Sequence, residues 1–182
     1  MNTLIAQWHA EHVDFSRLLN LFDEQLAEFH EGGSPDLALM LEIVAYLREY
    51  GDRAHHPLED AAFARLVLRD PNLQLPVNRL KQEHRSIAFA GEELTARLRA
   101  IVGEEVLPRA SVETAAALYL VYYRHHLAVE ERDILPRAAQ LLTAQDWLMV
   151  AATAGQRSTD PTRSQAHRNV KALLASRTAS AG

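Results

Sequence analysis

Residues 5–29 read IAQWHAEHVDFSRLLNLFDEQLAEF, a stretch in which large side chains recur regularly. Its large side chains recur at alternating intervals of three and four residues, which places them on one face of an α-helix. The stripe consists of Ile5, Trp8, His12, Phe15, Leu19, Phe22, Leu26 and Phe29. The pattern stops at 31–35, EGGSP, where glycine and proline end a helix. The stretch therefore predicts a long amphipathic helix with one histidine on its buried face.

The same pattern returns 72 residues later, in a helix expected from about Leu75 to Val102. The second stripe consists of Val77, Leu80, His84, Ile87, Gly91, Leu94, Leu98 and Ile101. The string Glu83-His84 repeats Glu11-His12 at the same offset. Such self-similarity is typical of an internal duplication.

Two further helices complete the repeat. One is expected from about Asp36 to a turn at 70–72, with Pro57 removing a backbone hydrogen bond and kinking it. The other is expected from Ser111, which we interpret as its N-cap. Their stripes contain Leu37, Leu41, Val44, Leu47, Gly51, His55, Ala62 and Leu66, and then Ala115, Tyr119, Tyr122, His126, Glu130 and Ile134.

Together these stripes predict an all-α fold, an up-down-up-down four-helix bundle built from a duplicated αα-hairpin. The string 143–146, TAQD, resembles a capping box and predicts a short fifth helix to about Ala154. The predicted domain therefore covers residues 1–154. Residues 155–182 are rich in Ser, Thr, Arg, Gln and Ala, and we expect a loosely docked or disordered tail.

The composition excludes several classes of function. The 182 residues hold 19 Lys plus Arg against 24 Asp plus Glu, so a net charge of −5 with no basic run argues against nucleic-acid binding. No cysteine is present, which excludes thiolate nucleophiles, iron–sulfur ligation and Cys-built zinc sites. The longest apolar run, 115–123, is shorter than the ~18 residues of a membrane helix. We expect a cytoplasmic protein without membrane partners or a phosphate-binding loop.

Six polar residues occupy stripe positions that would normally be apolar. They are His12, His55, Glu59, His84, His126 and Glu130. An unpaired buried polar group costs about 2–7 kcal/mol, and six of them would exceed the roughly 5–15 kcal/mol stability of a domain. A metal centre would satisfy all six at once, so we favour it over a purely structural polar layer.

The donor set favours two metal ions over one. A single structural zinc takes four ligands and would leave two of the six donors unmet. Four imidazoles and two carboxylates that can bridge suit a pair of iron or manganese ions, with an open position for a small molecule. Two carboxylates against four imidazoles argue against an oxygenase that cleaves C–H bonds.

Several assignments around this set stay open at the level of sequence. His56 and Asp60 have the same spacing as His55 and Glu59, and we favour the latter pair because it matches His126 and Glu130. His56 is then expected in the outer layer or on the surface. His9 is expected at the rim and His125 to point sideways, while His30 and His167 receive no role.

The acidic and aromatic neighbours of the ligands also receive expectations. Glu11 and Glu83 each precede a proposed ligand, and we expect both to be solvated. Tyr50, Tyr119 and Tyr122 are expected as core aromatics. The alternative for these phenols is a hydrogen bond to a bridge or a carboxylate of the site.

At about residues 3–150 the chain resembles the hemerythrin-like HHE cation-binding domains. The strings that carry the resemblance are Glu11-His12, the string HHPLED at 55–60, Glu83-His84, and the segment from His125-His126 through Glu130-Glu131 to Pro136. The resemblance implies a bundle with an oxo- or hydroxo-bridged di-iron centre. Its ligands would be His12, His55, His84 and His126, with Glu59 and Glu130 bridging. Oxygen-carrying members have a further histidine where this chain has Ala88, so the resemblance points to the non-carrier branch.

From this resemblance we expect two iron ions as cofactor, with manganese or zinc as substitutes. The first functional hypothesis is a protein that binds or reduces a small oxidant or gas, O2, NO or peroxide, for sensing or stress protection. The second is an iron donor for the repair of iron–sulfur clusters, with a redox or iron-acceptor protein as partner. The third is an interaction module that metal merely stabilises.

Overall fold

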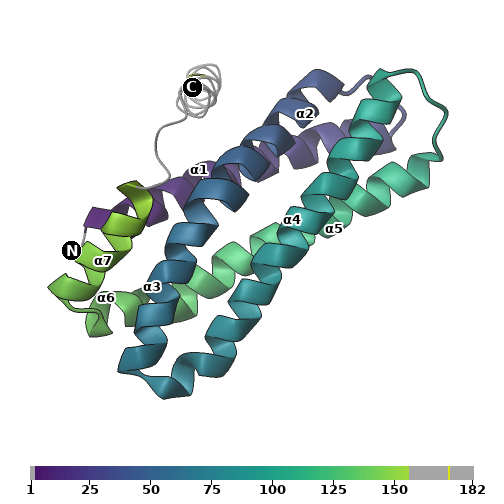
Figure 1. Cartoon of the computed structure of the whole chain (residues 1–182). Coiled ribbons are helices and arrows are strands. Elements are labelled where there is room, and N and C mark those ends of the chain that lie inside the picture. Colours follow the sequence, from purple (N-terminus) through teal and green to yellow (C-terminus); the bar gives the residue numbers. More distant parts are fainter. Residues whose placement is uncertain (1–2, 156–171, 173–182) are drawn as a thin grey trace.

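Four long helical runs lie side by side in the computed structural model, which describes residues 3–155 and Ala172 (Figure 1). The runs are α1 (Thr3–His30); α2 (Leu37–Tyr46) with η1 (Leu47–His55) and α3 (His56–Arg69); η2 (Pro71–Leu73) with α4 (Gln74–Val102); and α5 (Arg109–Val129) with η3 (Glu130–Ile134) and α6 (Leu135–Leu141). A short helix, α7 (Ala144–Gly155), follows. No strand occurs in the described part of the chain. The predicted all-α bundle is confirmed.

Two hydrophobic clusters fill the bundle, one on each side of a polar layer. Phe15 and Phe22 belong to the larger cluster, which extends toward the loop between α1 and α2. Trp8 and Phe63 belong to the smaller cluster, where Trp147 of α7 packs on Trp8 with ring centroids 5.9 Å apart. Each cluster contains residues from every long run, so the layer between them is closed off along the bundle axis.

The capping box predicted for the fifth helix is present. The Thr143 backbone N–H donates to Asp146 Oδ2 at 2.9 Å, and the Asp146 N–H donates to Thr143 Oγ1 at 3.3 Å. Arg69 Nε also donates to Asp146 Oδ2, at 2.9 Å, which ties the start of α7 to the end of α3.

Two π-helical segments, η1 and η3, interrupt the second and fourth runs. In η1 the His56 N–H bonds to Gly51 O, and in η3 the Leu135 N–H bonds to Glu130 O, each five residues back. Both segments end two residues before a proline, Pro57 or Pro136. Because proline lacks an N–H and clashes with the carbonyl four residues earlier, the α-helical bonding pattern cannot pass through it unchanged. The chain stays helical through Pro57, and the irregularity precedes the proline.

Two expectations about the fourth run are wrong. The helix begins at Arg109, and Ser111 lies inside its first turn, where its hydroxyl donates to Pro108 O at 2.8 Å. Tyr122 is 42% exposed, whereas Tyr123 is fully buried. Tyr123 fits because Gly51 faces it: a Cβ at that position would overlap the Tyr123 hydroxyl.

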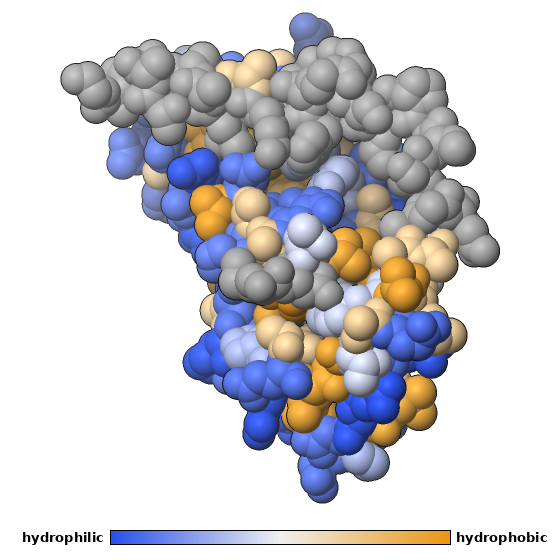
Figure 2. Space-filling model, turned by 90° about the vertical axis from the view of Figure 1, so that its left-hand side faces the viewer, coloured by the Kyte–Doolittle hydropathy of each residue, from blue (hydrophilic) through white to orange (hydrophobic). Residues whose placement is uncertain are grey.

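The surface mixes polar and apolar residues. Hydrophilic and hydrophobic side chains are interspersed on the face drawn in Figure 2. Among the described residues, no helix combines the length and apolar character needed to cross a bilayer. The predicted tail, including His167, lies outside the described residues except for Gly155 and Ala172.

Candidate metal centre

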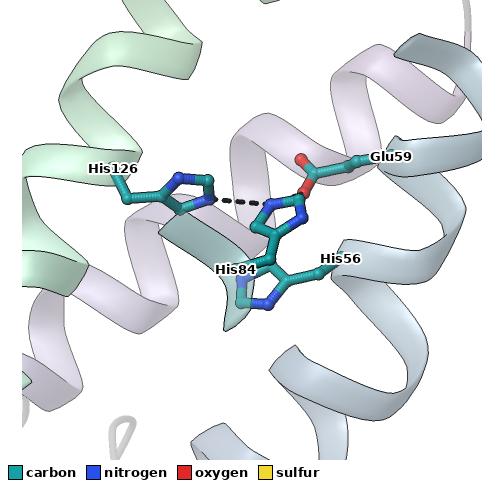
Figure 3. Close-up of side chains that lie close together, drawn as sticks. All are labelled: His56, Glu59, His84 and His126. Atoms are coloured by element: carbon teal, nitrogen blue, oxygen red, sulfur yellow. Dashed lines mark hydrogen bonds and ion pairs between the residues drawn. The ribbon is translucent and has the colours of Figure 1, made fainter. Parts of the chain in front are cut away.

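The six predicted ligands meet in the polar layer between the two hydrophobic clusters. All six are buried, and the structure adds a seventh, His56: the set is His12, His55, His56, Glu59, His84, His126 and Glu130. Donor atoms of His12, His55 and Glu59 lie within 4.8 Å of one another. Donor atoms of His56, Glu59, His84 and His126 do the same (Figure 3). Glu59 is shared, so the layer contains two adjacent groups of donors.

The imidazoles converge in pairs through their Nε2 atoms. His12 Nε2 lies 2.8 Å from His55 Nε2. His84 Nε2 lies 3.1 Å from His126 Nε2, the contact drawn as a dashed line in Figure 3. One pair therefore joins the first and second runs, and the other joins the third and fourth.

An outer carboxylate holds the Nδ1 atom of each of these four imidazoles. Glu131 lies 2.7 Å from His12 Nδ1 and Glu11 lies 2.6 Å from His55 Nδ1. Asp60 lies 3.2 Å from His84 Nδ1 and Glu83 lies 3.2 Å from His126 Nδ1. A neutral imidazole donates from one nitrogen and accepts at the other, so in the form that ligates metal Nδ1–H would face the carboxylate and the Nε2 lone pair would face inward.

The outer carboxylates follow the internal duplication. Glu11 and Glu83 precede equivalent histidines, and each reaches across to the histidine of the next run. The expectation that they are solvated is wrong for Glu11, which is buried, whereas the Glu83 side chain stays 29% exposed while it contacts an imidazole. The signal in the sequence was the repeated acidic residue beside a ligand, also seen in Asp60 and Glu131, which directly follow Glu59 and Glu130.

Glu11 is the most heavily bonded of the outer carboxylates. Besides His55, it accepts hydrogen bonds from the Tyr50 hydroxyl at 2.6 Å and from Gln7 Nε2 at 2.8 Å. Burial alone raises the pKa of Glu11, but His55, Tyr50 and Gln7 outweigh burial and lower it. Tyr50 thus meets the alternative expectation, a phenol bonded to a carboxylate of the site.

Two carboxylates, Glu59 and Glu130, lie fully buried at the centre. No oxygen of either accepts a hydrogen bond of good geometry within the described chain. Glu59 Oε1 lies 3.1 Å from His55 Nε2 and 3.3 Å from His12 Nε2, while its Oε2 lies 3.9 Å from His84 Nε2. Glu130 Oε2 lies 3.2 Å from His126 Nε2 and 3.6 Å from His12 Nε2, and its Oε1 lies 3.5 Å from His84 Nε2. Each carboxylate therefore faces both imidazole pairs.

The carboxylates around this layer stabilise positive charge on the imidazoles. Burial lowers the pKa of His12, but Glu131 and Glu59 outweigh it and raise the value to about 10. Burial also lowers the pKa of His126, but Glu130 and Glu83 outweigh burial and raise it to about 10. Without metal, protons on these imidazoles supply the positive charge. Imidazole nitrogens and carboxylate oxygens also suit first-row transition-metal ions, so the residues fit metal binding.

A family comparison matches this arrangement. The profile of the hemerythrin HHE cation-binding domain aligns with residues 3–138, which span the four helical runs and all seven inward-facing donors. The chain belongs to the hemerythrin HHE cation-binding family. No curated protein and no solved structure matches the chain significantly. The matched part of the HHE domain ends within α6, before the α7 helix that covers Trp8.

His56 was not among the six predicted ligands of the HHE domain, but its side chain lies in the polar layer. It is 2% exposed, so of the two expected positions, outer layer or surface, the surface is wrong. Its ring stacks on His84 with centroids 4.2 Å apart and an interplanar angle of 10°. Asp60, its expected alternative partner, instead bonds His84 from outside. Burial lowers the pKa of His56 well below its ordinary value, which keeps the ring neutral.

The remaining described histidines of the HHE domain lie outside the layer. His9 is exposed at the rim, where its Nδ1 lies 2.9 Å from Glu131 Oε2. His125 is exposed beside its buried neighbour His126 and faces Glu83 at 3.8 Å. His30 ends α1 and contacts Glu113.

Proposed function

We propose that this HHE domain is a non-heme di-iron protein that binds or reduces a small oxidant, O2, NO or peroxide, in sensing or stress protection. The observation that carries the proposal is the placement of Glu59 and Glu130, each buried and facing both imidazole pairs. A carboxylate in that position suits a bridge between two ions, because its two oxygens can bind one ion each.

In this proposal His12 and His55 would hold one iron, His84 and His126 would hold the other, and Glu59 and Glu130 would supply carboxylate oxygens to both. The outer carboxylates keep the imidazoles in the tautomer that offers Nε2 inward, and they increase the basicity of the ligands. When bound, an iron pair supplies redox electrons and coordination positions for a small molecule.

The burial of the site limits the size of what it accepts. The four paired imidazoles and both bridging carboxylates are at most 7% exposed, and a hydrophobic cluster lies on each side. A diatomic gas or peroxide fits this restriction better than an organic substrate. The enclosed layer also keeps bulk water away from the donors.

Metal analysis of anaerobically purified protein tests the proposal. We expect about two irons per chain, and charge-transfer bands that appear on addition of air, NO or peroxide. His126→Ala should abolish both, whereas His125→Ala, which changes an exposed neighbour, should leave both unchanged.

Two other outcomes would overturn the oxidant proposal. Iron that a mild chelator removes from an intact fold, without an optical response to any oxidant, would favour the iron-donating role. One zinc or no metal, with a melting temperature that chelation does not change, would refute the di-iron centre itself.

A further inference from the structure

His56 is a buried imidazole with no use in the site as described so far. Neither ring nitrogen makes a hydrogen bond to any residue that the structure describes. Its ring lies against the His84–His126 pair, stacked on His84 and edge-on to His126 with centroids 5.3 Å apart. An imidazole that served only to fill space here would leave two polar atoms unpaired, at a cost that an apolar side chain would avoid.

The surroundings of His56 resemble those of the four paired imidazoles, but the contact between the ring and its carboxylate is longer and is not a hydrogen bond. Its Nδ1 faces a carboxylate, Asp52 Oδ1, at 3.5 Å, one turn earlier on the same run. Asp52 Oδ1 is itself buried and accepts no hydrogen bond within the described residues. Nε2 of His56 is therefore the nitrogen left for the centre, as in the other four.

The π-helical segment η1 explains how two successive histidines reach the same layer. Successive side chains on an α-helix diverge by about 100°, so neighbours rarely share a site. The wider turn that ends at His55 sends that ring toward His12 and sends the His56 ring toward His84, with the two centroids 5.7 Å apart. The fourth run has the matching dipeptide, but there His125 is exposed.

We infer that His56 is a fifth imidazole ligand, oriented by Asp52, and that the two metal positions are inequivalent. The position at His84 and His126 then has three imidazoles, and the position at His12 and His55 has two. This inference rests on the proposed metal pair and adds one ligand to one of its two positions.

Iron loading of three variants tests the inference: His56→Leu, Asp52→Asn, and His125→Leu as an exposed histidine control. The probe is 57Fe(II), added anaerobically, with binding followed by chelator competition and the two iron environments followed by Mössbauer spectroscopy. Wild type and His125→Leu should hold two irons with two distinct doublets. His56→Leu should lower the affinity for one iron and change one of the two Mössbauer doublets.

Asp52→Asn provides the second arm, because it keeps the imidazole and changes only what orients it. We expect the affinity of one iron to fall about 10–100-fold while the other is unchanged. Metal-free His56→Leu should melt no lower than metal-free wild type, since it removes an unpaired polar group.

Two irons bound by His56→Leu with wild-type affinity and wild-type doublets would overturn the inference and leave the di-iron proposal intact. A lower melting temperature of the metal-free variant, with iron binding unchanged, would assign His56 to the core. Wild-type protein that bound no iron would overturn the proposed function as well.

Discussion

Replacement of Glu11 by glutamine should weaken metal binding strongly, although Glu11 is not a ligand. One oxygen of Glu11 accepts from Tyr50 and Gln7, and the other accepts from His55 Nδ1. All three partners donate, so a glutamine amide must place its NH2 group against at least one donor. It also removes the charge that holds His55 in the required tautomer.

The magnitude follows from burial and bonding. Loss of an outer partner of a metal-bound histidine costs about 10–100-fold in affinity, which is roughly 1.4–2.8 kcal/mol. Glu11 is buried and holds His55 at 2.6 Å, so we expect the upper end of that range. Glu83 is the matched comparison from the other half of the duplication. Its side chain is 29% exposed and its bond to His126 is 3.2 Å long, so Glu83→Gln should fall at the lower end.

The assay is anaerobic competition for Fe(II) against a chelator of known affinity, with circular dichroism to establish that each variant is folded. Glu49→Gln, which removes the partner of Arg53 outside the layer, is the control for loss of one acidic charge. An affinity of Glu11→Gln within twofold of wild type would refute the reasoning. So would a larger loss in Glu83→Gln than in Glu11→Gln.

Three further predictions follow from the described contacts. Adjacent carboxylates outweigh burial and raise the pKa values of His12 and His126 to about 10, so metal must displace protons from both rings. Co(II) affinity, measured by optical titration, should therefore rise from pH 6 to pH 8. An affinity that does not change with pH would contradict this. Gly51→Ala should lower stability to urea by about 1–3 kcal/mol, and adding Tyr123→Phe should restore most of it; equal losses in the single and double variants would exclude the proposed overlap. Trp8→Ala should cost about 3–5 kcal/mol in the same urea experiment, since Trp8 is fully buried against Trp147, and a loss below 1 kcal/mol would show that α7 does not cover it.

Most of the architecture was predictable because helix periodicity is a local property. The stripes of the first and third runs agree with α1 and α4, and the string at 143–146 agrees with the start of α7. Both depend on residues within a few positions of one another. The first errors appear where local signals compete: Ser111 is a good N-cap by type, but α5 already starts after Pro108, at Arg109, two residues before Ser111.

The inward position of the six polar stripe residues was also predictable, since a face of a helix is defined by spacing alone. Which side chains of the second run face inward near Pro57 was not predictable. There the π-helical segment η1 rotates the run so that His55 and His56 both face the layer. The choice between the two histidines thus had no answer in the sequence, because both side chains face the layer.

The helices, their duplication and the donors along each stripe can be predicted from the amino-acid sequence, because these follow from periodicity within one chain segment. What lies opposite each donor depends on how the helices pack. Glu11 looked solvated until the second run brought His55 against it, and Tyr123 rather than Tyr122 became buried because Gly51 of a neighbouring run leaves room for it. Contacts between runs depend on rotation and register of whole helices, and no local pattern encodes either.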